Sequence, residues 1–165
     1  MRLPLLALAI AALLPSVAAA QGTPAERPEV TAAAKAQRDQ VIAWRRDFHQ
    51  FPELSNREQR TAAKVAEHLR ALGLKPQTGI AHHGVVAIIQ GGKPGPKVAL
   101  RADMDALPVT EQTGLPFASK VTTQFAGQTT GVMHACGHDA HTGILLGVAK
   151  ALVDMQDTLP GEVLL

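Results

Sequence analysis

The chain is poor in the residues that several protein classes require. It has 165 residues with no tyrosine, one tryptophan and one cysteine, and charged residues make up only 18%. The formal net charge of +2 gives neither the basic surface typical of nucleic-acid-binding proteins nor an acidic disordered tail. One cysteine excludes an internal disulfide. The length and the apolar content are those of one domain with a buried core.

The N-terminal end has the pattern of a secretory signal peptide. An arginine at position 2 precedes the apolar run from Leu3 to Leu14, and small residues end the segment before Gln21. The run is shorter than the roughly 20 residues that span a bilayer, which favours a signal over a membrane anchor. We therefore expect residues 1–20 to be removed and the protein to be exported, to the periplasm or the medium. Residues 21–36 are expected to form a flexible leader, and the protein is expected to have no membrane contact after the signal is removed.

Hydrophobic periodicity predicts helices and strands over the rest of the chain. Apolar residues at helical spacing indicate three helices: about 31–51, where Val41, Trp44 and Phe48 share a face, 56–72 and 142–153. Short apolar runs indicate three strands: 85–89, 97–101 and a last one from Glu162. The first two strands flank a turn rich in glycine and proline and are expected to form a hairpin. Residues 109–131 are expected to be an irregular loop.

Local signals suggest how some of these elements begin. Ser55 and Glu58 have the spacing of a capping box for the second helix, and Glu53 is expected to accept hydrogen bonds in the preceding turn. The pair His82-His83 is expected in a loop, since neighbouring residues of an extended chain point to opposite sides. His68 is expected to be a surface residue.

Potential metal ligands are densest at residues 133–142. Cys136, His138 and His141 can each bind a transition metal, as thiolate or imidazole. Asp139 is expected to cap the following helix, which puts Cys136 and His138 in the turn that leads into it. A lone cysteine is more often a small buried residue than a ligand, but the histidine two residues later favours a shared ion.

A pair of aspartates forms a second candidate group. Asp103 and Asp105 follow the strand at 97–101, and they share one face if strand geometry persists. Two carboxylates after a buried strand need a cation, a histidine or backbone donors. The alternative is an aspartate-rich turn closed by Pro108.

Three stretches taken together resemble the signatures of the M20 metallopeptidase family. They are RRDFHQFPELS at 45–55, LRADMDALP at 100–108 and GVMHACGHDAHT at 131–142. They are most similar to its amidohydrolase branch, which includes hippurate hydrolases, N-acyl-amino-acid deacylases and auxin-conjugate hydrolases. The resemblance implies an α/β fold: residues 37–165 would be the N-terminal part of a zinc-peptidase-like catalytic domain. Its mixed sheet would be flanked by helices. The chain would stop before the later strands of this sheet and before the lid (dimerisation) domain.

The resemblance also implies a site and a reaction. Cys136 and His138 match two ligands of a centre that holds two divalent ions in the full-length family members, zinc, manganese, nickel or cobalt. Asp105 matches an aspartate that orients a ligand. The resemblance also implies supporting roles for Asp103, His134, Asp139 and His141. The implied reaction is hydrolysis of the amide bond of an N-acyl amino acid or small peptide by a metal-activated water, in a protein that is a homodimer at full length.

One part of the family's chemistry has no counterpart in the sequence. Relatives follow the last strand with a Phe-Gln-Pro-Ala-Glu-Glu type of motif, whose first glutamate is the general base and whose second is a ligand. Because the 165 residues contain neither, we expect this chain by itself to be inactive. The alternative is a non-catalytic exported remnant that binds metal weakly or not at all. A third hypothesis, a nucleophilic Cys136, predicts activity that survives chelation but not thiol alkylation.

Overall fold

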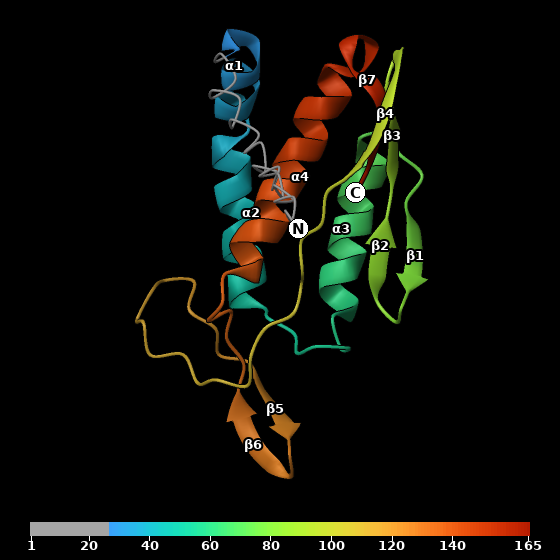
Figure 1. Cartoon of the computed structure of the whole chain (residues 1–165). Coiled ribbons are helices and arrows are strands. Elements are labelled where there is room, and N and C mark those ends of the chain that lie inside the picture. Colours follow the sequence, from blue (N-terminus) through green and yellow to red (C-terminus); the bar gives the residue numbers. More distant parts are fainter. Residues whose placement is uncertain (1–26) are drawn as a thin grey trace, which may run out of the picture.

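The protein has a mixed α/β architecture, as the sequence predicted. The computed structural model describes residues 27–165. Its helices are α1 (Pro28–Ala36), α2 (Arg38–Gln50), α3 (Gln59–Ala71), α4 (His138–Asp154) and the short 3-10 helix η1 (Gln156–Thr158). Its strands are β1 (Gln77–Ile80), β2 (Gly84–Val86), β3 (Ile88–Gln90), β4 (Lys93–Ala99), β5 (Thr122–Phe125), β6 (Gln128–Gly131) and β7 (Pro160–Leu164). Figure 1 shows the long helices side by side, next to the strands β1 to β4 and β7.

The first predicted helix is present, in two pieces. α1 and α2 are separated at Gln37, and α1 begins at Pro28. Residues 28–36, which we assigned to a flexible leader, are therefore helical. α1 buries none of its residues, whereas Phe48 near the end of α2 is 1% exposed. The predicted signal peptide lies outside the described residues.

Helix α3 begins later than predicted and is capped by a different residue. Asn56 has a left-handed backbone with φ of 61°, and Glu58 makes no side-chain capping bond, so the expected capping box is not formed. Instead, the Glu53 carboxylate accepts hydrogen bonds from the backbone N–H groups of Arg60 and Thr61, at 3.0 and 2.8 Å. Glu53 thus satisfies two free donors of the first turn of α3, which agrees with its predicted role as an acceptor.

The mixed sheet has the order β3-β7-β4 and corrects the predicted hairpin. β7 pairs antiparallel with β3 and parallel with β4, so β3 and β4 do not pair with each other. The two-residue link between them, Gly91 and Gly92, crosses the end of β7, which begins 68 residues after Gly92. Ile89 and Val163 form a buried cross-strand pair, and the opposite face carries the exposed pair Ile88 and Leu164. The predicted strand from Glu162 is confirmed and begins at Pro160.

Two further antiparallel pairs are present, and the predicted strand at 85–89 is divided at Ala87 into β2 and β3. β1 pairs with β2, and the turn between them holds His82 and His83, which confirms that these are loop residues. β5 pairs with β6, so part of the predicted irregular loop is a hairpin. This hairpin projects away from the body of the protein, at the bottom of Figure 1.

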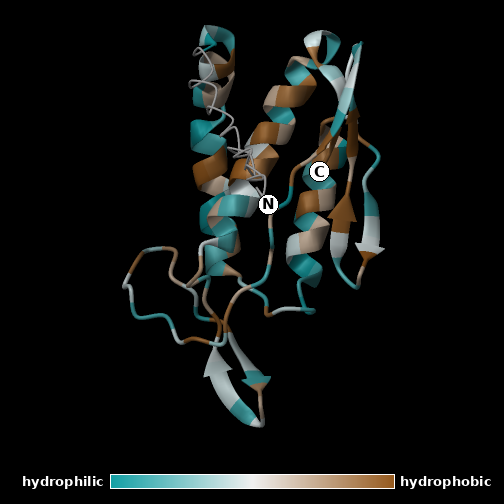
Figure 2. Ribbon diagram, in the orientation of Figure 1, coloured by the Kyte–Doolittle hydropathy of each residue, from teal (hydrophilic) through white to brown (hydrophobic). Residues whose placement is uncertain are grey.

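The main core lies where the helices meet the strands. Phe48, Leu69 and Leu146 come from α2, α3 and α4, and Ala87 joins them from the link between β2 and β3. Figure 2 shows apolar residues concentrated on α4 and on the strands beside it. α4 packs closely on α2 because it presents glycines there: a Cβ on Gly147 would lie 2.6 Å from the Val41 side chain. No helix among residues 27–165 is long and apolar enough to cross a membrane.

His68 is not the surface residue that its position on α3 suggested. It is half-buried against Trp44, with ring centroids 4.2 Å apart, and its Nε2 atom is buried without a hydrogen-bond partner. Burial lowers the pKa of His68. The amphipathic pattern of one helix could not show this, because the Trp44 ring that lies against His68 comes from another helix, α2.

Candidate functional site

The three sequence stretches that resembled one family come together at the N-terminal end of α4. The backbone N–H of Ala106 donates to Glu53 at 2.7 Å, which joins the first stretch to the second. Leu107 and Met133 exchange two backbone hydrogen bonds, at 2.9 and 3.0 Å, which join the second to the third. A small core of Leu54, Ala106 and Val132 lies beneath these links. Residues that are far apart in sequence are thereby fixed around one turn.

The turn that enters α4 carries the cysteine. Gly137 has a φ of 97°, a conformation that suits glycine, and its C=O accepts from the N–H groups of Ala140 and His141. Gly137 is therefore the N-cap, and the expected cap Asp139 lies inside the first turn of the helix. Cys136 lies in the turn, as predicted, and is exposed; His138, predicted in the same turn, is instead the first residue of α4.

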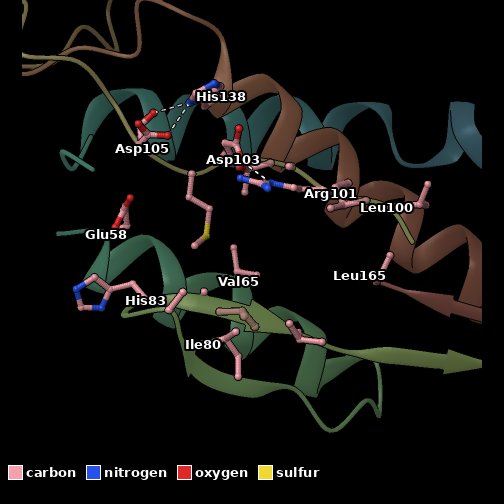
Figure 3. Close-up of a pocket in the computed structure, with 18 of the residues that line it drawn as sticks. Glu58, Val65, Ile80, His83, Leu100, Arg101, Asp103, Asp105, His138 and Leu165 are labelled. Atoms are coloured by element: carbon pink, nitrogen blue, oxygen red, sulfur yellow. Dashed lines mark hydrogen bonds and ion pairs between the residues drawn. The ribbon is translucent and has the colours of Figure 1, made fainter. Parts of the chain in front are cut away.

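His138 is held by the second aspartate of the predicted pair. Its Nδ1 atom lies 2.9 Å from the carbonyl oxygen and 3.0 Å from the Oδ1 atom of Asp105 (Figure 3). Both partners are acceptors, so Nδ1 carries the proton and donates. In the neutral ring, Nε2 therefore keeps its lone pair, the form that binds metals. This arrangement is what the predicted orienting role of Asp105 requires.

Asp103 and Asp105 do not act as a pair. Regular strand structure ends at Ala99, so the condition for a shared face is not met. The Asp103 carboxylate instead accepts from Arg101 Nε at 2.8 Å, and its backbone C=O accepts from the buried Thr142 hydroxyl at 3.0 Å. The predicted buried strand before them is wrong, because β4 is exposed at every position and Asp103 is exposed with it; Asp105 is half-buried and has a histidine partner, His138.

A buried polar cluster lies beside the turn. His49 bridges two carboxylates: its Nδ1 lies 2.8 Å from Asp139 Oδ2 and its Nε2 lies 3.0 Å from Glu111 Oε1. Arg45 Nε donates to the same Asp139 oxygen at 3.3 Å. Burial opposes ionisation of Glu111, but hydrogen bonds from Thr113, the Ser119 N–H and His49 outweigh it and lower the pKa of Glu111. The cluster ties α2, α4 and the loop at 111–119 together.

His134 and Asp139 each present buried atoms without partners. Both ring nitrogens of His134 and the Oδ1 atom of Asp139 make no hydrogen bond within the described chain. Burial, together with the nearby His49 and His138, lowers the pKa of His134 to about 4. His141, the last supporting residue that we predicted, is exposed, and its ring centroid lies 6.3 Å from that of His138.

Cys136 and His138 have donor atoms that a metal ion could bind. The thiol is exposed and the imidazole is fixed with Nε2 free, so both fit the chemistry of a borderline cation such as zinc. Within residues 27–165, no three or more histidine, cysteine, aspartate or glutamate side chains are grouped so that they could hold a metal ion.

Sequence reasoning missed some residues near the site. Glu111 lies in a stretch predicted to be an irregular loop, and no role was predicted for Arg45. His49 lies in the first of the three stretches but was given no role; it is in the last turn of α2 and is 3% exposed. No local pattern marks these residues as partners, because the contact between His49 and Asp139 spans 90 positions.

Comparison with known proteins gives consistent relatives. The model of the peptidase family M20/M25/M40 matches residues 99–165. Thermostable carboxypeptidase 1 of Saccharolobus solfataricus is 51% identical over 76% of this chain and 30% of that protein. The N-acyl-L-amino acid amidohydrolase of Geobacillus stearothermophilus is 46% identical over 74% of this chain and 31% of that protein.

A solved structure extends the likeness to the fold. It is that of the Bacillus subtilis YXEP protein, described as a dinuclear metal-binding peptidase of the M20 family. It matches with a TM-score of 0.69 and 43% identity, over 79% of this chain and 34% of that one. This chain thus spans about 30% of the length of the curated relatives that it matches.

Proposed function

Because the chain belongs to the peptidase family M20/M25/M40, we propose that it forms the N-terminal part of a metal-dependent amidohydrolase. The substrates are N-acyl amino acids or small peptides, and the reaction is hydrolysis of their amide bond. The relative from Geobacillus carries that substrate class in its name. The ions are divalent, two in the full-length form, and zinc, manganese, nickel and cobalt are the candidates.

The observation that carries the proposal is the hydrogen bond between Asp105 and His138. Asp105 fixes the imidazole with Nδ1 protonated, which would leave the lone pair of Nε2 available to an ion. The thiol of Cys136 lies two residues earlier in the exposed turn, and the two side chains are the ligands that this chain would contribute. A divalent ion, when bound, supplies Lewis acidity and lowers the pKa of water.

The other residues of the site have supporting roles in this proposal. Glu53 and Ala106 hold the segment that carries Asp105, and Asp139 with His49 holds the turn that carries Cys136. The proposal assigns the general base to none of the carboxylates in the described residues. We therefore propose that the 165-residue chain by itself does not turn over substrate. The homodimer and export through residues 1–20 are further parts of the proposal.

The experiment compares the 165-residue chain with a longer form that carries the rest of the family's catalytic domain. Both are measured for metal content and for hydrolysis of a panel of N-acetyl amino acids, before and after chelation. We expect turnover only in the longer form, with loss on chelation and recovery on addition of zinc, manganese, nickel or cobalt. Turnover that survives chelation but not thiol alkylation would instead identify Cys136 as a nucleophile and overturn the proposal.

Two substitutions in the longer form test the ligand assignment. Cys136→Ala and His138→Ala are each expected to remove metal-dependent turnover and to lower the bound metal. His82→Ala, in the turn between β1 and β2, is the matched control and is expected to leave both unchanged. Full turnover after metal is restored to either ligand variant contradicts the assignment.

A further inference from the structure

One carboxylate connects the loop at 111–119 to helix α2. Glu111 accepts hydrogen bonds from the Thr113 hydroxyl and from the Ser119 backbone N–H, which close these residues into a compact loop. The Oε1 atom of Glu111 also lies 3.0 Å from Nε2 of the buried His49, in the last turn of α2. In Figure 1 the loop lies next to the ends of α2 and α4 that face each other there.

Ring contacts hold the same loop on α2. The Phe117 ring meets the His49 ring edge-on, with centroids 5.6 Å apart. The guanidinium of Arg46 lies over the same Phe117 ring, 5.2 Å from its centre. Glu111 is therefore presented to His49 by the packing of the loop as well as by charge.

The hydrogen bonds fix where the protons of this cluster lie. Burial opposes ionisation of Glu111, but its three hydrogen bonds lower its pKa, so the carboxylate is ionised and can only accept. Nε2 of His49 therefore donates to Glu111. On the other side of the ring, Nδ1 lies 2.8 Å from Oδ2 of Asp139. With both carboxylates ionised, the His49 ring carries a proton on each nitrogen and holds both of them.

Asp139 transmits this restraint to the candidate metal ligands. It follows His138 directly, in the first turn of α4. Its Oδ1 atom has no partner in the described chain, so its side chain is held through Oδ2 by His49 and Arg45. The Arg45 contact is longer, at 3.3 Å, and the Arg45 side chain is 45% exposed, so the buried His49 contact is the stronger restraint.

We propose that Glu111 is a positioning residue for the candidate metal centre. It fixes the His49 ring, the ring fixes Asp139, and Asp139 fixes the first turn of α4, which keeps His138 against Asp105. This role rests on the proposed function, because it takes His138 as a metal ligand. The loop at 111–119 and the metal ligands then form one mechanical unit, and a change in either part affects the other.

The first test compares Glu111→Gln with the unaltered 165-residue chain, without metal. Glutamine keeps the shape of the side chain but removes the charge that holds the proton on His49. At about pH 8.5, where a free imidazole is neutral, we expect nitrogen NMR of the unaltered chain to show His138 as one tautomer, protonated at Nδ1. In Glu111→Gln we expect a mixture of both tautomers. Titration with Co²⁺ is expected to show about tenfold weaker binding in the variant.

Val163→Ala is the matched control for lost stability, because Val163 is buried in β7 and takes no part in the cluster. Both variants are expected to unfold at lower urea concentration, but only Glu111→Gln changes the His138 tautomer and the cobalt affinity. Glu111 is not a positioning residue if His138 keeps its single tautomer in Glu111→Gln, or if Val163→Ala alters it equally. If the unaltered chain binds no cobalt, the ligand assignment fails, and the tautomers still decide whether Glu111 positions His138.

A second measurement needs no substitution. Coupling between two sites is reciprocal, so a metal ion bound by Cys136 and His138 must in turn stabilise the loop. Hydrogen exchange of the Ser119 amide, which donates to Glu111, is expected to slow by about fivefold when zinc is added. The amides of β1 and β2 are the internal control and are expected to be unaffected. Unchanged exchange at Ser119 when the site is saturated with zinc would contradict the coupling.

Discussion

His49 Nδ1 lies 2.8 Å from Asp139 Oδ2, although the two residues are 90 positions apart in the chain. The other ring nitrogen of His49 is bonded to Glu111, and the side chains of His49, Asp139 and Glu111 are at most 4% exposed. One imidazole thus compensates two buried carboxylates. It connects the end of α2 to the first turn of α4, directly after His138.

Replacing His49 by alanine leaves both carboxylates buried without their shared partner. Removing one member of a buried ionic group typically costs about 3–5 kcal/mol, and we expect a loss of about 3 kcal/mol for His49→Ala. Urea unfolding measures it. Arg38→Ala, which removes an ion pair at the surface, is the control and is expected to leave the midpoint unchanged. Equal midpoints for the two variants would show that the His49 bridge does not stabilise the fold.

Helices and strands could be predicted from the sequence far better than contacts between residues that are far apart in the chain. The helix at α4 and the strand at β7 were visible because their apolar patterns are local. The hairpin of 85–89 with 97–101 was wrong because β7 takes the position between them, which no pattern near residue 90 indicates. The family resemblance predicted the orienting role of Asp105. Neither local sequence patterns nor the resemblance predicted the bridge that His49 forms.

Glu53 provides the second prediction, on the start of α3. Its carboxylate caps two N–H groups, so Glu53→Ala is expected to cost about 1–2 kcal/mol of unfolding free energy. Glu58→Ala is the matched control and is expected to be nearly neutral, because Glu58 makes no side-chain capping bond. Urea unfolding of both variants separates the two candidate caps. A larger loss of unfolding free energy in Glu58→Ala than in Glu53→Ala would show that Glu58 caps α3, as the predicted capping box requires.

The third prediction concerns metal affinity in the 165-residue chain. Titration with Co²⁺, followed by the absorption of a cobalt–thiolate bond, is expected to show weak binding that Cys136→Ala and His138→Ala abolish. Asp105→Ala is expected to weaken it by about 10- to 100-fold, because His138 loses the acceptor that fixes its ring. The Asp103→Ala variant is the control and is expected to leave the affinity unchanged, since the Asp103 carboxylate bonds to Arg101 and not to His138. Unchanged affinity in Asp105→Ala would mean that Asp105 does not orient a ligand.

The buried His134 is expected to lower the free energy of unfolding as the pH decreases. Burial lowers its pKa to about 4 in the folded chain, from an ordinary value of 6.5. Between these two values the unfolded chain binds more protons, so the free energy of unfolding falls as the pH decreases from about 6.5 to about 4. The shift corresponds to at most about 3 kcal/mol. We expect His134→Gln to flatten this part of the stability curve, measured by urea unfolding at several pH values, while His82→Gln in the exposed turn leaves it unchanged. An undiminished slope in His134→Gln would assign the acid sensitivity to other groups, among which the half-buried His68, with its lowered pKa, acts in the same direction.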